Sequence, residues 1–307
     1  MKKSLSVLLI LSLILSACEN ANKKQKATNP DQKLKVFTVN YPLYYFAERI
    51  GDEFIDLIYP IPNDVDPAYW VPTQSLEDIQ SCDIILANGA DYAKWMGKVS
   101  LPSAKVVNTS EAFTESFIKI EEGSTHSHGA SGEHVHYGYA FTTWLDFKIA
   151  LGQAEAIKDA FIEKLPKHKA AISENFDELK SELTELDKSM VSIGNELQGQ
   201  TLFASHPVYQ YLAQAYGLDI ISEHWEPGEM PDDKQWDDFK HNLDHNVSNF
   251  MLWEGEPGQD IKNSLKSLDI TTIVFVPCSN KPKASNFMEI MRENVKNMMA
   301  VISADMK

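Results

Sequence analysis

Four of the nine histidines in this chain fall within eleven residues, at His126, His128, His134 and His136. They belong to the segment STHSHGASGEHVHYGY (124–139), whose glycines let the backbone fold back on an ion. Alternating histidines place neutral imidazoles on one side of an extended strand, and imidazole suits zinc, copper and nickel. This His-rich loop (124–139) is therefore the first candidate for metal chemistry.

Two glutamates in the last third of the chain are further candidates. Glu226 lies in EHWEP (223–227) and Glu254 in WEGEP (253–257), and each follows a predicted strand. Strand ends of this kind face the ligand crevice of an α/β fold, where a carboxylate would offset the charge of an ion. A solvated turn is the alternative for each, because most glutamates lie at the surface.

The elements that must position these groups alternate between strand and helix. We expect strands at 35–39, 54–61, 83–87 and 106–107, and again at 201–205, 218–222, 249–253 and 271–276, with helices between them. This order predicts an α/β fold with two lobes, each built on a mostly parallel sheet.

One long helix is expected between the two lobes. Its apolar residues are spaced alternately by four and three positions, and they are Ile172, Phe176, Leu179, Leu183, Leu186, Met190, Ile193 and Leu197. Such a seam indicates a helix with one buried face. We prefer a rigid strut within the chain; a dimeric coiled coil is the alternative.

The predicted lobes span 34–150 and 199–307, joined by a helical connector at 151–198. Small-ligand sites favour the interface between domains. We therefore expect the ligand in the cleft between the lobes.

A series of short motifs recurs in order along the chain: Tyr41-Pro42-Leu43-Tyr44, Val65-Asp66-Pro67, Trp144-Leu145-Asp146, Ser205-His206 and Tyr216-Gly217-Leu218. In this series the chain resembles the zinc and manganese solute-binding proteins of ABC transporters, from about Lys35 to the C-terminus. The resemblance implies two lobes joined by a rigid helix, and a metal held in the cleft by histidines and a carboxylate. It also implies a membrane permease as partner.

The usual ligands of that family are mostly missing. Ala68 follows Asp66-Pro67 where the family has a histidine, and Thr142 replaces the histidine before Trp-Leu-Asp. Val276-Pro277 stands where the family has an aspartate, so only His206 matches a family ligand. Alanine and valine have no donor atom, and the usual tetrahedral site cannot form unchanged.

The His-rich loop could replace the lost ligands. We expect it to fold in and bind one ion together with His206, while Glu226 and Glu254 are possible carboxylate ligands. Zinc is the expected ion, with manganese as an alternative. Two other interpretations stay open: the loop only collects ions weakly, or it has no metal role.

The N-terminus indicates export and lipid anchoring. Residues 1–17 have two lysines at the start and then an apolar run too short to span a bilayer, as in a secretory signal peptide. The run ends Leu15-Ser16-Ala17-Cys18, which resembles the bacterial lipoprotein box with Cys18 as the lipidated residue. An ordinary cleaved signal is the alternative. Residues 18–33 are polar and are expected to form a flexible tether.

Composition narrows the possible functions. The formal charge of −16, or −18 once Lys2 and Lys3 leave with the signal peptide, argues against nucleic-acid binding. Besides Cys18 there are only Cys82 and Cys278, which could form one disulfide but are expected to be buried free thiols. We expect a monomer outside the cytoplasm, at the periplasmic or cell surface.

Two rival classes of function remain. A zinc hydrolase could use the same histidines, but the sequence has no His-Glu-x-x-His helix and no Gly-x-Ser-x-Gly elbow. A protein of the same fold that binds a non-metal solute, or acts as an adhesin, is favoured by the lost ligands and opposed by the histidine cluster. We therefore expect a binding protein and not an enzyme.

The anchoring of the chain can be tested with Cys18→Ser. We expect this variant to be released from the membrane or to remain unprocessed, because the lipidated thiol is gone. Membrane fractionation with a size comparison measures both results. A Cys18→Ser protein that stays in the membrane fraction at the processed size would show that Cys18 carries no anchor.

Overall fold

The computed structural model describes residues 33–120, 125–127, 133–135, 138–226 and 228–305. The predicted signal peptide with Cys18, most of the predicted tether, and His128 and His136 lie outside these residues. Leu34–Lys307 form one compact unit.

The first sheet contains four parallel strands in the order β2-β1-β3-β4. Their bounds are Leu34–Thr38 (β1), Ile55–Ile58 (β2), Ile84–Ala87 (β3) and Val106–Asn108 (β4). The central strands β1 and β3 are buried almost throughout, as their runs of apolar residues predict. The expected strand at 54–61 is shorter, because Pro60 and Pro62 cannot donate to a ladder.

Short helices connect these strands. The α-helices are Tyr41–Gly51 (α1) and Leu76–Ser81 (α2), and the 3-10 turns are Asp52–Phe54, Lys94–Lys98, Ser103–Lys105 and Glu111–Ser116. Helix α1 begins where the side chain of Asn40 accepts a hydrogen bond from the amide of Leu43. Pro42 is favourable there, because the first turn needs no amide donor.

Two small antiparallel ladders follow. Lys119–Ile120 (β5) pairs with Gly138–Tyr139 (β8), and Thr125–Ser127 (β6) pairs with Glu133–Val135 (β7). The second ladder belongs to the His-rich loop, and its register places His126 directly opposite His134.

The second sheet repeats the plan of the first, with parallel strands in the order β10-β9-β11-β12. These strands are Thr201–Ala204 (β9), Asp219–Ser222 (β10), Phe250–Trp253 (β11) and Thr271–Val274 (β12). Its helices are Gln210–Tyr216 (α5), Asp233–His245 (α6), Gln259–Lys266 (α7) and Phe287–Asp305 (α8). Below, the first lobe means β1–β4 with α1, α2 and the segments between them. The second lobe means β9–β12 with α5–α8 and the segments between them.

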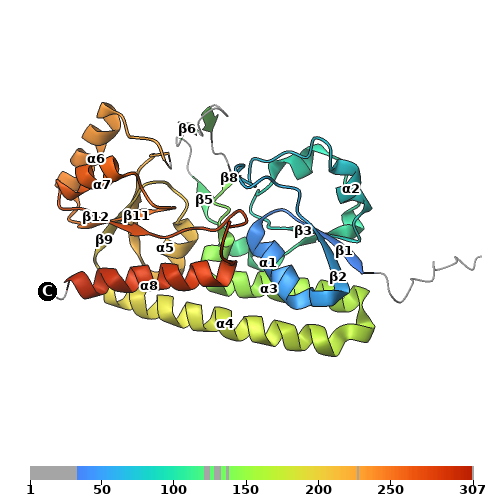
Figure 1. Cartoon of the computed structure of the whole chain (residues 1–307). Helices are drawn as coiled ribbons and strands as arrows, with labels where there is room; N and C mark the ends of the chain where they lie inside the picture. The colour runs from blue at the N-terminus through green and yellow to red at the C-terminus, as the bar shows by residue number, and fades with distance from the viewer. Residues whose placement is uncertain (1–32, 121–124, 128–132, 136–137, 227, 306–307) are drawn as a thin grey trace, which may run out of the picture. The chain divides into compact units, whose positions relative to one another are not determined.

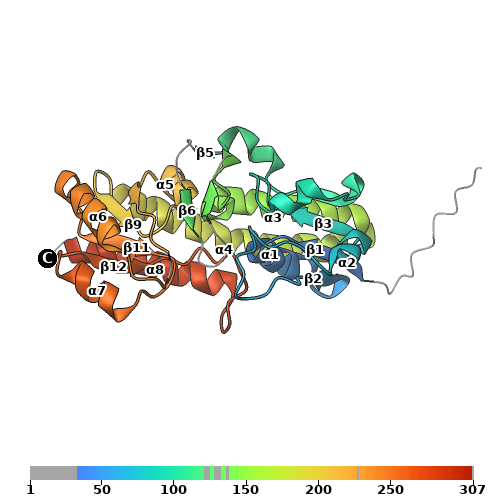
Figure 2. The same ribbon diagram turned by 90° about the horizontal axis from the view of Figure 1, so that it is seen from above.

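The long connecting helix is present. Thr143–Leu145 form a 3-10 turn before Phe147–Lys164 (α3), and a turn at Pro166–His168 leads into Lys169–Glu196 (α4). The 28 residues of α4 span about 42 Å at ~1.5 Å per residue. Helix α4 runs beneath both sheets, which lie toward its opposite ends (Figures 1 and 2). The predicted fold class, two parallel α/β lobes with one long helix, is confirmed.

The apolar seam of α4 is buried within the chain. Every one of its predicted members is at most 5% exposed. The helix packs against α3 and α1 on one side of the molecule and against α8 and α5 on the other. Because the chain's own helices cover the seam, α4 is a strut within the chain, as expected, and not part of a coiled coil.

A single carboxylate of α4 reaches both lobes. Glu182 Oε1 pairs with Arg49 Nη2 of α1 at 2.7 Å, and Glu182 Oε2 pairs with Arg292 Nη2 of α8 at 2.7 Å. Burial alone would raise the pKa of Glu182, but the two guanidinium groups lower it. The strut is therefore joined to each lobe by charge as well as by apolar packing.

Two glycines allow a close contact between α4 and α5 and the tight end of α5. A Cβ on Gly194 of α4 would lie 2.0 Å from the carbonyl oxygen of Tyr216, so only glycine lets α4 approach the end of α5. Gly217 then ends α5 in the left-handed region, with φ of 64°.

Cys82 and Cys278 are buried free thiols, as expected. Among the residues that the structure describes, every helix is too short or too polar to cross a membrane.

The strut can be tested at Leu183, the fully buried centre of the seam. Leu183→Pro should lower the free energy of unfolding by ~3 kcal/mol or more, because it removes a helix hydrogen bond and clashes with the preceding turn. Leu183→Ala should cost about 2–5 kcal/mol through the cavity that it leaves. Thermal and urea unfolding measure both. Exposed Glu185→Ala is the control, expected within about 0.5 kcal/mol; near-native melting of Leu183→Pro would contradict a continuous strut.

Candidate functional site

The order of strands in the second sheet marks a position for a ligand. The chain leaves β9 toward β10 on one side, whereas β11 and β12 lie on the other side, so the order reverses between β9 and β11. In open parallel sheets, ligands bind outside the carboxyl ends of the strands at such a reversal. His206 lies two residues after β9 and Glu254 one residue after β11, so both side chains belong to this place.

His206 and Glu254 contact each other directly. Nδ1 of His206 lies 3.0 Å from Oε1 of Glu254, and the two side chains are 8% and 22% exposed. Burial alone would lower the pKa of His206. The hydrogen bond to Glu254 and its negative charge outweigh burial and raise that pKa. With Glu254 in contact with Nδ1, a ligand would be bound by the other ring nitrogen, Nε2.

Two more carboxylates act on the same imidazole. Glu226 follows β10 in the second lobe, and Asp66 lies in the first lobe between β2 and α2. The charges of both contribute to the raised pKa of His206. We call His206, Glu254, Glu226 and Asp66 the interlobe site. The negative charges of its three carboxylates all act on a single histidine, which favours a cation.

The loop that carries Asp66 is a tight turn closed on itself. Asp66 Oδ1 accepts a hydrogen bond from the amide of Ala68 at 2.9 Å, and the Asp66 carbonyl accepts from the amides of Tyr69 and Trp70 at 3.1 Å. These bonds fix the backbone around Asp66. The carboxylate is thus held by local structure although its side chain is exposed.

Three tyrosines of the first lobe lie in the electrostatic field of Asp66. Burial first, and then the Asp66 charge, raise the pKa of Tyr59, Tyr69 and Tyr92. The hydroxyl of Tyr92 is buried and has no hydrogen-bond partner among the described residues. All three remain neutral phenols at physiological pH.

His224 is exposed and comes just after β10. Partial desolvation and the neighbouring His206 lower the pKa of His224. Its neighbour Glu223 is buried, and Glu223 Oε1 accepts a hydrogen bond from Asn242 at 2.9 Å. Glu223 is therefore a structural group of the second lobe, whereas His224 keeps a neutral imidazole close to the interlobe site.

The positions of the three lost family ligands hold structural groups. Ala68 is buried, and the Thr142 hydroxyl donates to the carbonyl of Val208 at 2.6 Å. The amide of Val276 donates to Asn294 Oδ1 at 2.9 Å. Cys278 is buried, which raises the pKa of its thiol to about 12.

The structure brings His206 and Glu254 together, with Glu226 close enough for its charge to act on His206. His126 and His134 are described only as paired backbone positions of β6 and β7, and His128 and His136 lie outside the described residues. Among the described side chains, no three His, Cys, Asp or Glu groups are placed to hold one ion. A four-ligand zinc site would therefore need donors beyond these side chains.

In the first sheet, the corresponding place between β1 and β3 is filled by the chain's own amides. Asn40 Nδ2 donates to Asn88 Oδ1 at 3.1 Å, and Gln153 Nε2 donates to the same oxygen at 3.1 Å. All three side chains are buried. The first lobe therefore contributes to the interlobe site through the loop after β2, and not through its strand reversal.

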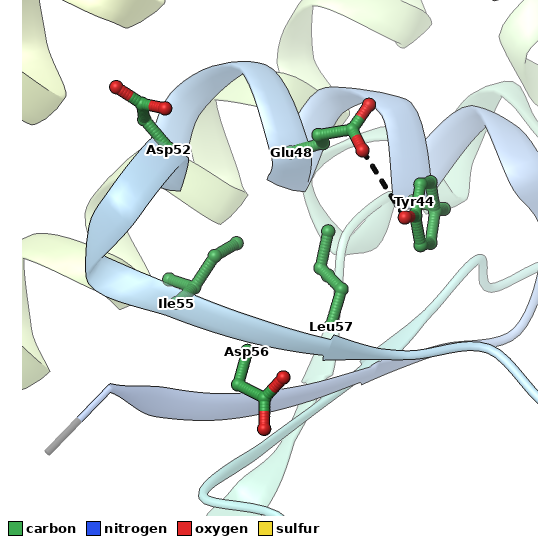
Figure 3. A pocket seen from close by; sticks show the side chains of 6 residues that line it. All are labelled: Tyr44, Glu48, Asp52, Ile55, Asp56 and Leu57. Carbon is green, nitrogen blue, oxygen red and sulfur yellow. Dashed lines mark hydrogen bonds between the residues drawn. The ribbon is translucent and has the colours of Figure 1, made fainter.

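A surface pocket also lies between α1 and β2 (Figure 3). It is lined by Tyr44, Glu48, Asp52, Ile55, Asp56 and Leu57, and the hydroxyl of Tyr44 donates to Glu48 Oε1 at 3.2 Å. Its groups are carboxylates at an open sheet edge, without a histidine. The interlobe site is the better candidate.

Comparison with known proteins finds one matching family model, described as the periplasmic component A of the zinc-uptake complex, over residues 36–301. The high-affinity zinc uptake system protein ZnuA of Bacillus subtilis is 25% identical over 302 residues, covering 92% of each chain. The zinc-binding lipoprotein AdcA of Streptococcus pneumoniae is 24% identical over 96% of this chain, which spans 60% of that longer relative.

Solved structures show the same fold. The metal-dependent lipoprotein YcdH from Bacillus subtilis superposes with a TM-score of 0.73 at 21% identity, over 88% of this chain and 98% of that one. The Zn(II)-bound ZnuA-like domain of Streptococcus pneumoniae AdcA also gives a TM-score of 0.73, at 20% identity, over 89% and 98% of the two chains.

The interaction of Glu254 with His206 predicts a titration that can be measured without metal. In Glu254→Gln the pKa of His206 should fall, because the imidazolium loses its nearest negative charge. A raised pKa stabilises the folded protein most below the unperturbed histidine value of about 6.5, and this contribution is lost as the pH rises through the raised pKa. Glu254→Gln should thus reduce stability at acidic pH and change it little at alkaline pH.

NMR titration of the histidine ring protons and urea unfolding at two pH values measure these effects. Glu256→Gln is the matched control, because Glu256 is exposed and pairs with Lys262. An unchanged His206 titration in Glu254→Gln would show that the two side chains do not interact in solution.

Proposed function

Because the chain belongs to the family of periplasmic zinc-uptake components, which matches it over residues 36–301, we propose that it is the extracytoplasmic solute-binding protein of an ABC transporter. In this role it captures a divalent metal ion, zinc in the first place, and delivers it to a membrane permease. The members of this family are components of a transport complex, so the chain is a binding protein and not an enzyme.

The observation that carries this proposal is the pair of His206 and Glu254 at the strand reversal of the second sheet. A histidine that binds zinc commonly donates its other ring N–H to a carboxylate, which fixes the ring and increases its basicity. Glu254 stands in this relation to His206 Nδ1, so Nε2 is the atom offered to the ion. Glu226 and Asp66 supply negative charge from the two lobes.

Relatives support zinc as the ion. ZnuA of Bacillus subtilis is named for high-affinity zinc uptake, and AdcA of Streptococcus pneumoniae is named as zinc-binding. In the present chain, His206 retains one of the family's metal ligands. Ala68, Thr142 and Val276 occupy the positions of the other three and do not supply the usual ligands there. We propose that His126, His128, His134 and His136 supply the missing imidazoles. Glu226, or Glu254 after a rotation, is the carboxylate that could complete the set.

Anchoring belongs to the same proposal. Lipidation of Cys18 would hold the protein at the outer face of the membrane, close to its permease, while residues 18–33 act as the tether. The protein would act as a monomer.

The lost ligands also favour a second candidate, in which the same fold binds a different solute or a surface partner. Similar structures include a laminin-binding adhesin from Streptococcus agalactiae, with a TM-score of 0.69 at 17% identity. This candidate predicts a protein without a tight zinc site.

Zinc titration separates these possibilities. His206→Ala should weaken zinc binding by about 10- to 100-fold or more, which is the loss already typical of outer-shell partners. Replacing all four loop histidines by asparagine should cost about as much if the loop supplies ligands. Isothermal titration calorimetry of each variant beside the wild type measures the affinity and the number of sites.

Replacing exposed His241 and His245 by asparagine provides the control for the loss of histidines in general. A loop variant that keeps one site of full affinity would show that the loop only collects ions. A wild-type protein without a tight zinc site would contradict the proposed function itself.

A further inference from the structure

The segment between β12 and α8 crosses from the second lobe to the first. At the second sheet, the chain is anchored by the amide of Phe275, which donates to the carbonyl of Trp253 at 2.8 Å. Its far end reaches α1, where the amide of Tyr41 donates to the carbonyl of Ser279 at 2.9 Å. We call residues 276–281 the crossing segment.

Asn280 in the crossing segment uses its side chain for three hydrogen bonds to the first lobe, and its Oδ1 also accepts a fourth from the amide of Lys281 at 2.7 Å. Asn280 Oδ1 accepts from the hydroxyl of Tyr59 at 3.0 Å. Asn280 Nδ2 donates to the carbonyls of Pro62 at 2.7 Å and Val65 at 2.8 Å. The phenol can donate and the two carbonyls can only accept, so this network defines which end of the carboxamide is which.

The backbone on either side supports this placement. Cys278 adopts φ of 62°, a left-handed conformation that is uncommon outside glycine, and it turns the chain toward the first lobe. The carbonyl of Pro277 accepts from Trp144 Nε1 at 2.8 Å, and Lys281 Nζ lies 4.8 Å from the ring centroid of Tyr44. Asn280 is thus held between two further contacts with residues outside its own lobe.

The two carbonyls that Asn280 binds belong to the loop that leads into Asp66. Val65 immediately precedes Asp66, and the bond to its carbonyl ends one residue before the Asp66 turn. Asp66 is the member of the interlobe site that comes from the first lobe. A movement of this loop would therefore move the first-lobe part of the site relative to His206 and Glu254.

We propose that Asn280 is a positioning residue of the interlobe site, which ties loop 62–66 to the second lobe and so holds Asp66 with the other members of the site. This inference rests on the proposed function, because it gives Asn280 a part in retaining the metal ion. Asn280 itself need not touch the ion.

The positioning role depends on the hydrogen-bonding groups of the Asn280 carboxamide, and not only on its volume. Aspartate has almost the same shape as asparagine but would place a negative oxygen against the carbonyls of Pro62 and Val65. Asn280→Asp should therefore break the tie and repel the loop, whereas a residue that merely fills space would tolerate this exchange. Asn297→Asp is the matched control: Asn297 is also half-buried, and its Nδ2 donates to the carbonyl of Val274 at 2.9 Å within the second lobe.

The first measurement is amide hydrogen exchange of the full chain without metal. We expect exchange at residues 62–70 to become faster in Asn280→Asp than in the wild type, and to stay unchanged in Asn297→Asp. Tyr59→Phe, which removes one of the three bonds and keeps the ring, should show a smaller increase. Unchanged exchange in Asn280→Asp would show that the tie does not hold the loop.

The second measurement is zinc titration of the same full-length variants, with zinc ion alone as the probe. Asn280→Asp and Asn280→Ala should bind zinc about 10-fold more weakly or worse, with Asp at least as harmful as Ala, and Asn297→Asp should bind within about twofold of the wild type. Tyr59→Phe gives a milder variant if Asn280→Asp does not fold.

The outcomes distinguish the positioning role of Asn280 from the proposed function of the protein. If the wild type binds zinc and Asn280→Asp binds it equally well, the positioning role is wrong and the proposed function stands. If the wild type binds no zinc, both are wrong. Faster exchange of the loop with unchanged zinc affinity would also overturn the positioning role.

Discussion

The packing of the α4 seam is the interaction that attaches both lobes to one helix. This helix buries one apolar row against α1 and α3 of the N-terminal half and against α5 and α8 of the C-terminal half. Interiors of this kind are close-packed and resist small displacements. Because Glu182 adds one charged contact to each lobe, the two sheets are attached to one rod. Contacts between the lobes can then be made by short segments such as 62–66 and 276–281.

On this frame, the interlobe site combines one buried imidazole with carboxylates from two lobes. Glu254 makes the direct contact, while Glu226 and Asp66 act through their charge. In the absence of a cation, these charges favour the protonated imidazole. A metal ion competes with that proton, because a ligating histidine must be neutral. The same negative charges that hold the proton therefore also attract the ion that replaces it.

Much of the fold follows from local patterns in the sequence. The alternation of four and three positions from Ile172 to Leu197 predicts α4, and the short apolar runs predict the strands of both sheets within a few residues. The sequence indicates His206 and Glu254 as separate candidates, but it does not predict their contact. It depends on β9 lying beside β11, an order that periodicity does not encode.

The role of Asn280 has no sequence signal, since an asparagine between a strand and a helix is most often an ordinary loop residue. The motif Val65-Asp66-Pro67 carries a family resemblance, but the effect of the Asp66 charge on His206 depends on the three-dimensional arrangement.

Zinc K-edge X-ray absorption of the zinc-loaded, full-length protein tests the central claim most directly. We expect one zinc per chain, with a first shell of nitrogen and oxygen at about 2.0–2.2 Å, and the loss of one nitrogen in His206→Ala. A shell that contains sulfur at about 2.3 Å, or one that is unchanged in His206→Ala, would contradict a site built on His206.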